Sequence, residues 1–73
     1  MTEKRYTISG MSCNHCVMAL RKELDAVAGV EILEAQVGSA VLAFEPAIVP
    51  ESAIIAAVEE AGYSVVSAEA IAN

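Results

Sequence analysis

The chain has no tryptophan, and its only aromatic residues are two tyrosines and one phenylalanine among 73 residues. Cysteine is equally scarce, since Cys13 and Cys16 are the only two. A disulfide between residues so close together would close a very small loop and restrain the unfolded chain little, so we do not expect one to hold the fold. A chain this short has room for one small domain, Met1–Asn73, which excludes most enzymes.

Long apolar runs are also missing. No stretch approaches the roughly 18 residues that a membrane-spanning helix needs, so we expect no membrane insertion. The start, Met1–Arg5, is polar and charged and leads into neither an apolar segment nor a cleavage site, so we expect no secretory signal. We therefore predict a soluble cytoplasmic protein, and Met1 and the uncharged end of the chain favour a complete small protein over an excised domain. Thiols stay reduced in that compartment, where a close cysteine pair is more often metal-binding or catalytic than structural.

Basic residues are few: four lysines and arginines stand against ten acidic residues, giving a net charge of −6. Binding of nucleic acid requires clustered positive charge, so we expect no nucleic-acid partner. The four basic residues all lie near the start of the chain, and every charged residue from Glu23 onward is acidic. They are Lys4, Arg5, Arg21 and Lys22.

Hydrophobic periodicity predicts two helices and four strands. Alternating apolar residues predict strands, and apolar residues three and four positions apart predict amphipathic helices. The expected strands are Tyr6–Ser9, Val30–Val37, Ala40–Phe44 and Tyr63–Val66, and Ala68–Asn73 is expected to be a frayed tail. The expected helices are His15–Val27, with Val17, Leu20, Leu24 and Val27 on its apolar face, and a second one from Pro50 to Gly62, with Ile54, Val58 and Ala61.

Two further details concern the centre of the chain. In the second strand we expect Leu33, Ala35 and Val37 on one face, with Glu34 and Gln36 on the other. The dipeptide Gly38-Ser39 then predicts a tight hairpin turn into the third strand.

The order of elements is βαββαβ. Short connections and right-handed crossovers fold this order into an α+β, ferredoxin-like sandwich: a four-stranded antiparallel sheet with two helices on one face. The apolar positions supply a core without help from a metal, at about 1.5 to 3 kcal/mol for each fully buried large side chain. Any metal that the chain binds is therefore expected to be cargo.

Candidate chemistry is concentrated in Met11–Cys16, where two thiols lie two residues apart on a turn that leads into a helix. The unpaired N–H groups and positive dipole at a helix start favour thiolates. Two thiolates suit a soft ion of low coordination number such as Cu(I), whereas Zn(II) prefers four ligands. A thioredoxin-like redox pair and a merely structural pair are the alternatives.

The segment Gly10–Cys16 resembles the metal loop of the heavy-metal-associated domain family, and the bacterial copper chaperones of that family are most similar. The resemblance extends to Gly29-Val30, Val41–Phe44 and Ala61–Tyr63. It implies Cu(I) held by Cys13 and Cys16, delivery to a copper-transporting P-type ATPase, and a Tyr63 that lies on a neighbouring loop facing the metal. The chain departs from the family pattern in the shorter hairpin at Gly38-Ser39.

Other residues near the pair each allow more than one interpretation. Met11 is either a thioether ligand or a packed side chain, and packing is favoured. His15 is a third ligand, a bridge in a copper-linked homodimer, or a solvated side chain, and for the monomer we favour the last. Tyr63 is a hydrogen-bond donor toward sulfur or an aromatic cover. Arg21 and Lys22 are either simply solvated or a patch that steers an acidic partner.

Three functions are consistent with these residues. The favoured one is a copper chaperone that is not an enzyme and passes Cu(I) on by ligand exchange. The alternatives are a metal-binding module of a heavy-metal ATPase or a mercury-type carrier and, with less support, a thiol-disulfide oxidoreductase. Lack of tryptophan and the Asn14-His15 pair between the thiols argue against the oxidoreductase.

Overall fold

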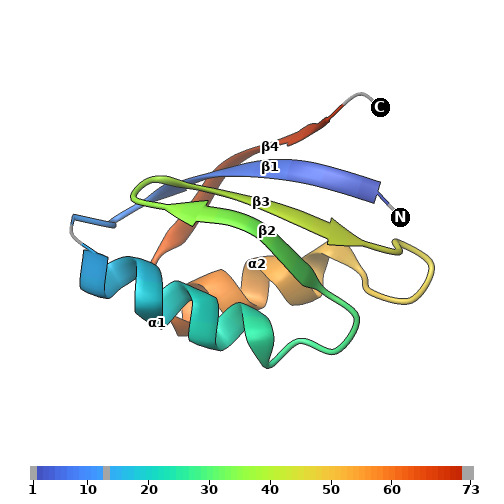
Figure 1. Ribbon diagram of the computed structural model, residues 1–73, viewed down its shortest axis with the longest axis horizontal. Coiled ribbons are helices and arrows are strands. Elements are labelled where there is room, and N and C mark those ends of the chain that lie inside the picture. Colours follow the sequence, from blue (N-terminus) through green and yellow to red (C-terminus); the bar gives the residue numbers. More distant parts are fainter. Residues whose placement is uncertain (1, 13, 72–73) are drawn as a thin grey trace.

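The computed structural model describes residues 2–12 and 14–71. A sheet forms one layer and two helices form the other, with both helices on the same face of the sheet (Figure 1). The elements are β1 (Thr2–Ser9), α1 (Asn14–Asp25), β2 (Glu31–Gln36), β3 (Ser39–Phe44), α2 (Glu51–Glu60) and β4 (Ser64–Ala70).

The strand order in the sheet is β2-β3-β1-β4, and every neighbouring pair is antiparallel. Strands β1 and β3 therefore lie at the centre, while β2 and β4 are the edges. This arrangement confirms the predicted ferredoxin-like sandwich. None of the helices in the described ranges is long and apolar enough to cross a membrane.

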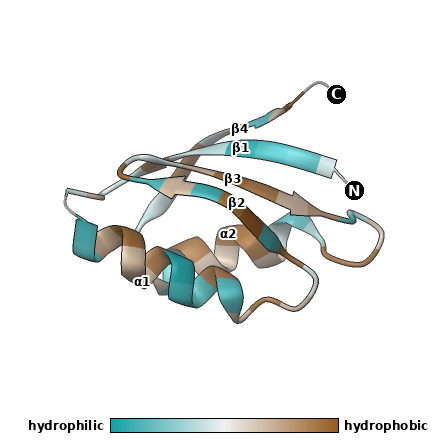
Figure 2. Ribbon diagram, in the orientation of Figure 1, coloured by the Kyte–Doolittle hydropathy of each residue, from teal (hydrophilic) through white to brown (hydrophobic). Residues whose placement is uncertain are grey.

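The core lies between the sheet and the helices, where apolar segments of the two layers face each other (Figure 2). Among the described residues, none of the buried ones is polar or charged by type. As predicted, Leu20 and Leu24 of α1 and Ile54 and Val58 of α2 are buried. Ala57 completes the buried face of α2, whereas Ala61 caps the helix and is only half-buried.

The predicted faces of β2 are correct for Glu34, Ala35 and Gln36 but wrong for Leu33, because a β-bulge falls at that residue. Ile32 pairs with Leu42 and Glu34 pairs with Val41, so Leu33 is the extra residue between them. Ile32 therefore packs against the core, while Leu33 is 45% exposed. Because the bulge adds one residue, Ile32 and Ala35 share the face toward the helices although they lie three positions apart, which the spacing within β2 alone does not reveal.

The predicted frayed tail is also wrong as far as Ala70. Strand β4 extends to that residue and pairs with β1, and the Ile71 N–H donates to the Glu3 carbonyl at 2.9 Å. Its side chains beyond Val66 are small or polar, and a register shift interrupts its pairing, so its alternation is weak. Ala72 and Asn73 lie outside the described residues. Strand β1 likewise begins at Thr2, well before the predicted Tyr6.

Candidate metal site

The loop from β1 to α1 begins at Gly10, which has φ +94°. Residues with a Cβ rarely adopt this left-handed conformation, so glycine is the residue that allows the chain to turn here. The loop continues through Met11 and Ser12, and α1 then starts at Asn14. The end of β1 and the first turn of α1 are thereby brought to the same end of the sandwich (Figure 1). Below, the two ends of the sandwich, where the loops lie, are called its edges.

Cys16 lies in the first turn of α1 and is half-buried. Backbone N–H groups in the first turn of a helix have no intrahelical acceptor, and the helix dipole adds partial positive charge there. The first turn of α1 contains no acidic residue that would oppose a second anion. This environment favours the thiolate of Cys16. Cys13, the other predicted ligand, lies outside the described residues.

Tyr63 lies on the loop between α2 and β4, next to the start of the β1–α1 loop. A Cβ placed on Gly10 would be 3.4 Å from Cδ1 of Tyr63. The Tyr63 N–H donates to the Val58 carbonyl at 3.1 Å, and the side chain packs half-buried against the core. The tyrosine is thereby held beside the loop in which the sequence places the metal.

The β2–β3 turn reaches the same edge. The Ile8 N–H donates to the Gly38 carbonyl at 2.8 Å, which places the turn beside the end of β1. Val37 in this turn is 46% exposed. The hairpin is distant from the β1–α1 loop in sequence, but in the fold it is a neighbour of the strand that leads into that loop.

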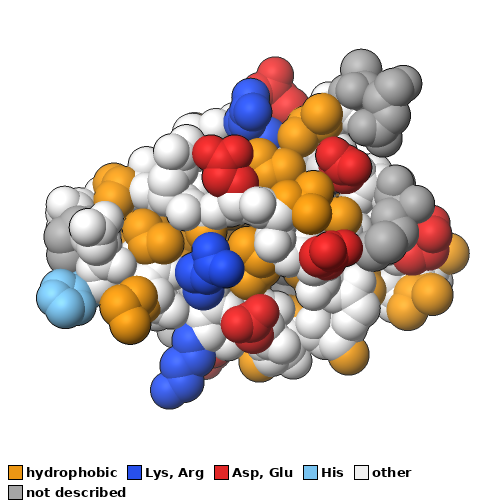
Figure 3. Space-filling model, in the orientation of Figure 1, with side chains coloured by type: hydrophobic (Ala, Val, Ile, Leu, Met, Phe, Trp, Pro, Cys, Tyr) orange, Lys and Arg blue, Asp and Glu red, His pale blue; other side chains and the backbone are white. Residues whose placement is uncertain are grey.

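The remaining predicted site residues divide into packed and exposed side chains. Met11 is half-buried and packs against the core, as the packing interpretation predicts. His15, Arg21 and Lys22 are all exposed on α1. In Figure 3, basic side chains stand over α1, whereas acidic side chains gather over the part of this face nearer the opposite edge.

One exposed residue near the site was missed by the sequence analysis. Met18 of α1 is 67% exposed, although methionine is usually found in the core. The available signal was its spacing: Met18 falls between the apolar positions Val17 and Leu20 and thus outside the predicted stripe. In the described part of the chain, which lacks Cys13, no three His, Cys, Asp or Glu side chains come together as a metal site.

The opposite edge of the sandwich contains a different polar cluster. Lys4 and Tyr6 of β1 both donate hydrogen bonds to Oε2 of Glu51 in the first turn of α2, the tyrosine at 3.1 Å. The hydrogen bond from Lys4 lowers the pKa of Glu51, outweighing its partial burial. Burial, followed by the hydrogen bond to Glu51, raises the pKa of Tyr6. These bonds tie the start of α2 to the central strand.

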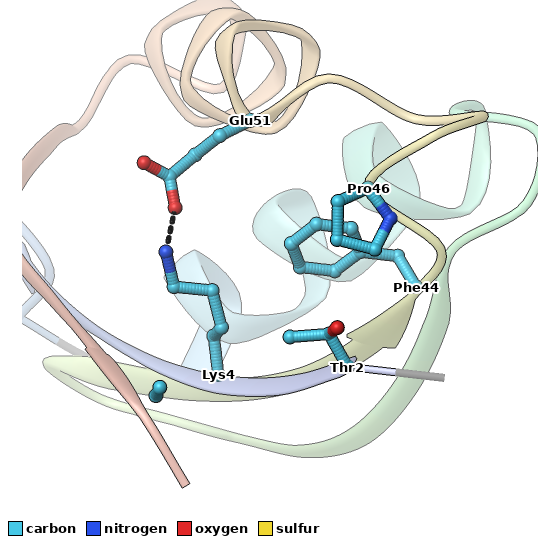
Figure 4. A pocket seen from close by; sticks show the side chains of 6 residues that line it. Thr2, Lys4, Phe44, Pro46 and Glu51 are labelled. Atoms are coloured by element: carbon cyan, nitrogen blue, oxygen red, sulfur yellow. Dashed lines mark hydrogen bonds and ion pairs between the residues drawn. The ribbon is translucent and has the colours of Figure 1, made fainter.

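A cavity of about 260 Å³ lies at this edge, with the Lys4–Glu51 pair at its side (Figure 4). Its lining is mostly apolar, and its two charged side chains already bind each other. The described residues that line it include none from the β1–α1 loop, so the cavity is separate from the candidate metal site, and the carboxylate that lines it is already paired with Lys4. The lining residues are Thr2, Lys4, Phe44, Pro46, Glu51 and Ala70.

Comparison with known proteins yields one matching family and several similar chains. Residues 5–64 match the model of the heavy-metal-associated domain. The chain is 39% identical to the copper chaperone CopZ of Bacillus subtilis over 69 residues, which cover 89% of this chain and 97% of the relative. It is 33% identical to the copper chaperone CopZ of Enterococcus hirae over 63 residues, which cover 84% of this chain and 91% of the relative.

Among solved structures, a copper binding domain from HMA7, a P-type ATPase, superposes with a TM-score of 0.74 at 29% identity. The superposition covers 99% of this chain and 96% of that domain. The similar chains thus include both copper chaperones and a copper binding domain from a P-type ATPase.

Proposed function

This chain belongs to the heavy-metal-associated domain family, and we propose that it is a cytoplasmic copper chaperone that binds Cu(I) through Cys13 and Cys16. It is a metal-binding carrier and not an enzyme. The copper chaperones among its relatives are matched over nearly their whole length, which supports a role as a carrier of copper.

The observation that carries the proposal is the position of Cys16. Its thiol lies in the first turn of α1, at an edge where the helix start provides positive potential and no acidic side chain of that turn competes. A second thiolate three positions earlier completes a pair of soft, anionic ligands. Such a pair suits Cu(I), which accepts low coordination numbers and prefers sulfur.

Transfer follows from the openness of a two-coordinate site. A thiolate of the acceptor binds the copper ion to give a three-coordinate intermediate shared by both proteins. One of the two original Cu–S bonds then breaks and its sulfur leaves as a thiolate. A second thiolate of the acceptor binds the ion before the other original Cu–S bond breaks. Copper stays Cu(I) throughout, and no electron or oxidant is required. The barrier stays low because each bond breaks only after a new one has formed.

The proposed acceptor is the soluble metal-binding domain of a copper-transporting P-type ATPase. Support comes from the similarity to a copper binding domain of such a pump. Arg21 and Lys22 are exposed on the helix that begins at the site. We propose that they steer encounter with an acidic acceptor surface, since complementary charge accelerates association without a large interface.

Three neighbouring side chains complete the proposed site. Tyr63 covers the loop from the side of Gly10 and donates its hydroxyl proton toward sulfur. Met11 packs beneath the loop as apolar filler. His15, which is exposed and faces away from Cys16 of its own chain, reaches the copper ion of a second copy in a copper-linked homodimer. Replacing His15 by alanine should reduce copper-driven dimerisation, measured by size-exclusion chromatography at one and two equivalents of copper, more than it reduces affinity for the first ion.

The proposal is tested by titrating the reduced protein with Cu(I) and Zn(II) in competition with a chelator. We expect one Cu(I) per chain, with two sulfur ligands seen by X-ray absorption. Cys16→Ser should weaken binding by more than the roughly 10- to 100-fold that loss of an outer-shell partner costs. Ser12→Ala, which changes the same loop without removing a thiol, serves as the control. Indifference of the reduced protein to Cu(I), or catalytic turnover of a mixed disulfide, would overturn the proposal.

A further inference from the structure

The exposed side of α1 next to the site carries two soft donor atoms at helical spacing. His15 and Met18 lie three residues apart in α1 and are both exposed, Met18 by 67%. Side chains three positions apart in a helix are surface neighbours, with Cβ atoms about 5–6 Å from each other. An imidazole nitrogen and a thioether sulfur can therefore reach one ion between them.

Met18 is unusual for its place in the helix. Its surface neighbours one turn away in either direction are polar or charged: Asn14, His15, Arg21 and Lys22. An amphipathic helix ordinarily carries polar residues along this face. Neither core packing nor the apolar stripe of α1 accounts for a methionine here.

Neither donor is already engaged by the rest of the protein. Within residues 2–12 and 14–71, no hydrogen bond or ion pair involves the His15 imidazole. Thioether sulfur is only a weak hydrogen-bond acceptor, so water binds the sulfur of Met18 weakly. Binding an ion here would displace water and would break no internal contact.

This pair is distinct from the thiol site. At about 100° per residue, Cys16 points roughly 130° away from the direction midway between His15 and Met18. Its partial burial, against the exposure of the other two, agrees with that difference. His15 and Met18 therefore face outward, while Cys16 faces the edge at the loop.

We propose that His15 and Met18 form a second, weaker binding site for a soft monovalent metal ion, on the outer face of α1. Imidazole suits copper and thioether selects Cu(I), so the donor set has the same preference as the thiols. Both ligands are neutral, so the site lacks the charge attraction of two thiolates and holds its ion less tightly. It lies within one helical turn of Cys16 and serves as a point where the ion rests on its way to or from the thiol pair.

The proposal extends the proposed function, since it concerns the same cargo, but its test does not depend on the thiols. A Cys13→Ser/Cys16→Ser protein, shown to be folded by its amide NMR spectrum, is titrated anaerobically with Cu(I). The methyl signal of Met18 and the ring signals of His15 should shift together and saturate at one ion per chain. Zn(II) should leave the Met18 methyl unmoved. Met1 and Met11 provide internal reference methyl signals.

The decisive variant is Met18→Leu, which keeps the size of the side chain and removes the sulfur. In the thiol-free protein, the Cu(I) affinity measured from the shift of the His15 ring signals should fall by at least about 10-fold. This is the lower end of the loss that follows removal of a group that supports a metal ligand. Ile48→Ala, a change at an equally exposed apolar residue elsewhere, is the control. A His15 shift that is unchanged in Met18→Leu, or a Met18 methyl that does not move, overturns the proposal.

If the thiol-free protein does not fold, the same signals are followed in the intact protein. One equivalent of Cu(I) is bound first, and the second equivalent is then added. Movement of the Met18 methyl only with the second equivalent supports the proposal, and no movement overturns it. Failure of the thiol site would instead appear as the absence of tight binding of the first equivalent, so the two failures are distinguishable.

Discussion

The two helices begin at opposite ends of the sandwich (Figure 1). Their first turns differ in charge. The first turn of α2 carries Glu51, whose carboxylate accepts hydrogen bonds from Lys4 and Tyr6. The first turn of α1 has no acidic residue and carries Cys16. Both helix starts attract negative charge, but only α2 satisfies that attraction with a carboxylate of its own.

This difference separates stability from function. At the start of α2 an internal anion fastens helix to sheet, and the contact is complete within the chain. The first turn of α1 has no acidic side chain of its own, so its positive potential can stabilise thiolates instead. We therefore expect changes at α2 to alter the free energy of unfolding with little effect on copper, and changes at α1 to do the reverse.

The largest effect should come from Glu51→Ala. It removes the acceptor of the fully buried Tyr6, and an unsatisfied buried donor costs about 1–3 kcal/mol. The ion pair with Lys4 adds little, because the Glu51 side chain is 39% exposed and solvent screens it. Urea denaturation measures the loss, and Glu60→Ala, an exposed change at the other end of α2, is the control.

Copper affinity should be unchanged in Glu51→Ala. A protein that loses copper binding in parallel with stability would show that the two edges are coupled. In the wild type, the part of this contribution that depends on the charge of Glu51 should disappear in acid. The pKa of Glu51 is lowered in the fold, so the stabilisation is complete above the ordinary carboxyl value of about 4.3 and is lost as pH falls through the folded value.

The second effect concerns the loop that leads into α1. Gly10→Ala forces a Cβ into a left-handed conformation, at about 1–2 kcal/mol, and places it 3.4 Å from Cδ1 of Tyr63. Gly62→Ala is the matched control, since its φ is +97° but a Cβ there meets nothing within 4 Å. We expect Gly10→Ala to be the more destabilising and to shift the ring signals of Tyr63. Equal losses would show that the contact with Tyr63 does not constrain the loop.

Tyr6→Phe removes one of the two hydrogen-bond donors to Glu51 and leaves the other. Glu51 keeps Lys4 as a partner, so the loss should be about 0.5–1.5 kcal/mol at neutral pH. The raised pKa of Tyr6 means that the wild type loses stability as pH rises above about 10, where an unfolded tyrosine ionises and the buried one does not. Thermal unfolding between pH 9 and 11 should show a smaller decline in Tyr6→Phe; parallel declines would contradict this role.

The smallest effect is expected from making α1 resemble α2. Asn14→Asp adds a carboxylate to the first turn of α1, which should stabilise the helix by about 0.3–1 kcal/mol. The added charge also opposes thiolates, so reaction of the thiols with iodoacetamide at pH 7 should slow. Asn14→Ser, which adds no charge, is the control. Faster alkylation in Asn14→Asp than in Asn14→Ser would contradict our account of the α1 edge.

Element order and fold were predictable because α1, α2 and the central strands have clear periodicity. Apart from the early start of the central strand β1, the errors in the strands fall on the two edge strands. In β2 a bulge at Leu33 and in β4 a register shift beside Val66 displace the alternation. Both shifts are set by pairing with a neighbouring strand, so no pattern within β2 or β4 alone contains them.

For the site, sequence placed Cys16 correctly at the start of α1, because the apolar spacing of α1 marks where that helix begins. The position of Tyr63 came from family resemblance, not from the residues themselves. The hydrogen-bonded cluster of Lys4, Tyr6 and Glu51 was not predicted. Its partners are 47 and 45 positions away, and only the register of β1 against its neighbours brings them together.

The pairing of Lys4 with Ala70 places the beginning of β1 and the end of β4 side by side, at the edge away from Gly10. A tether or fusion partner joined at either of these ends would extend from the back of the molecule. If several copies were joined end to end, the links would lie away from Gly10. The β1–α1 loop of each copy would therefore stay accessible to an approaching domain.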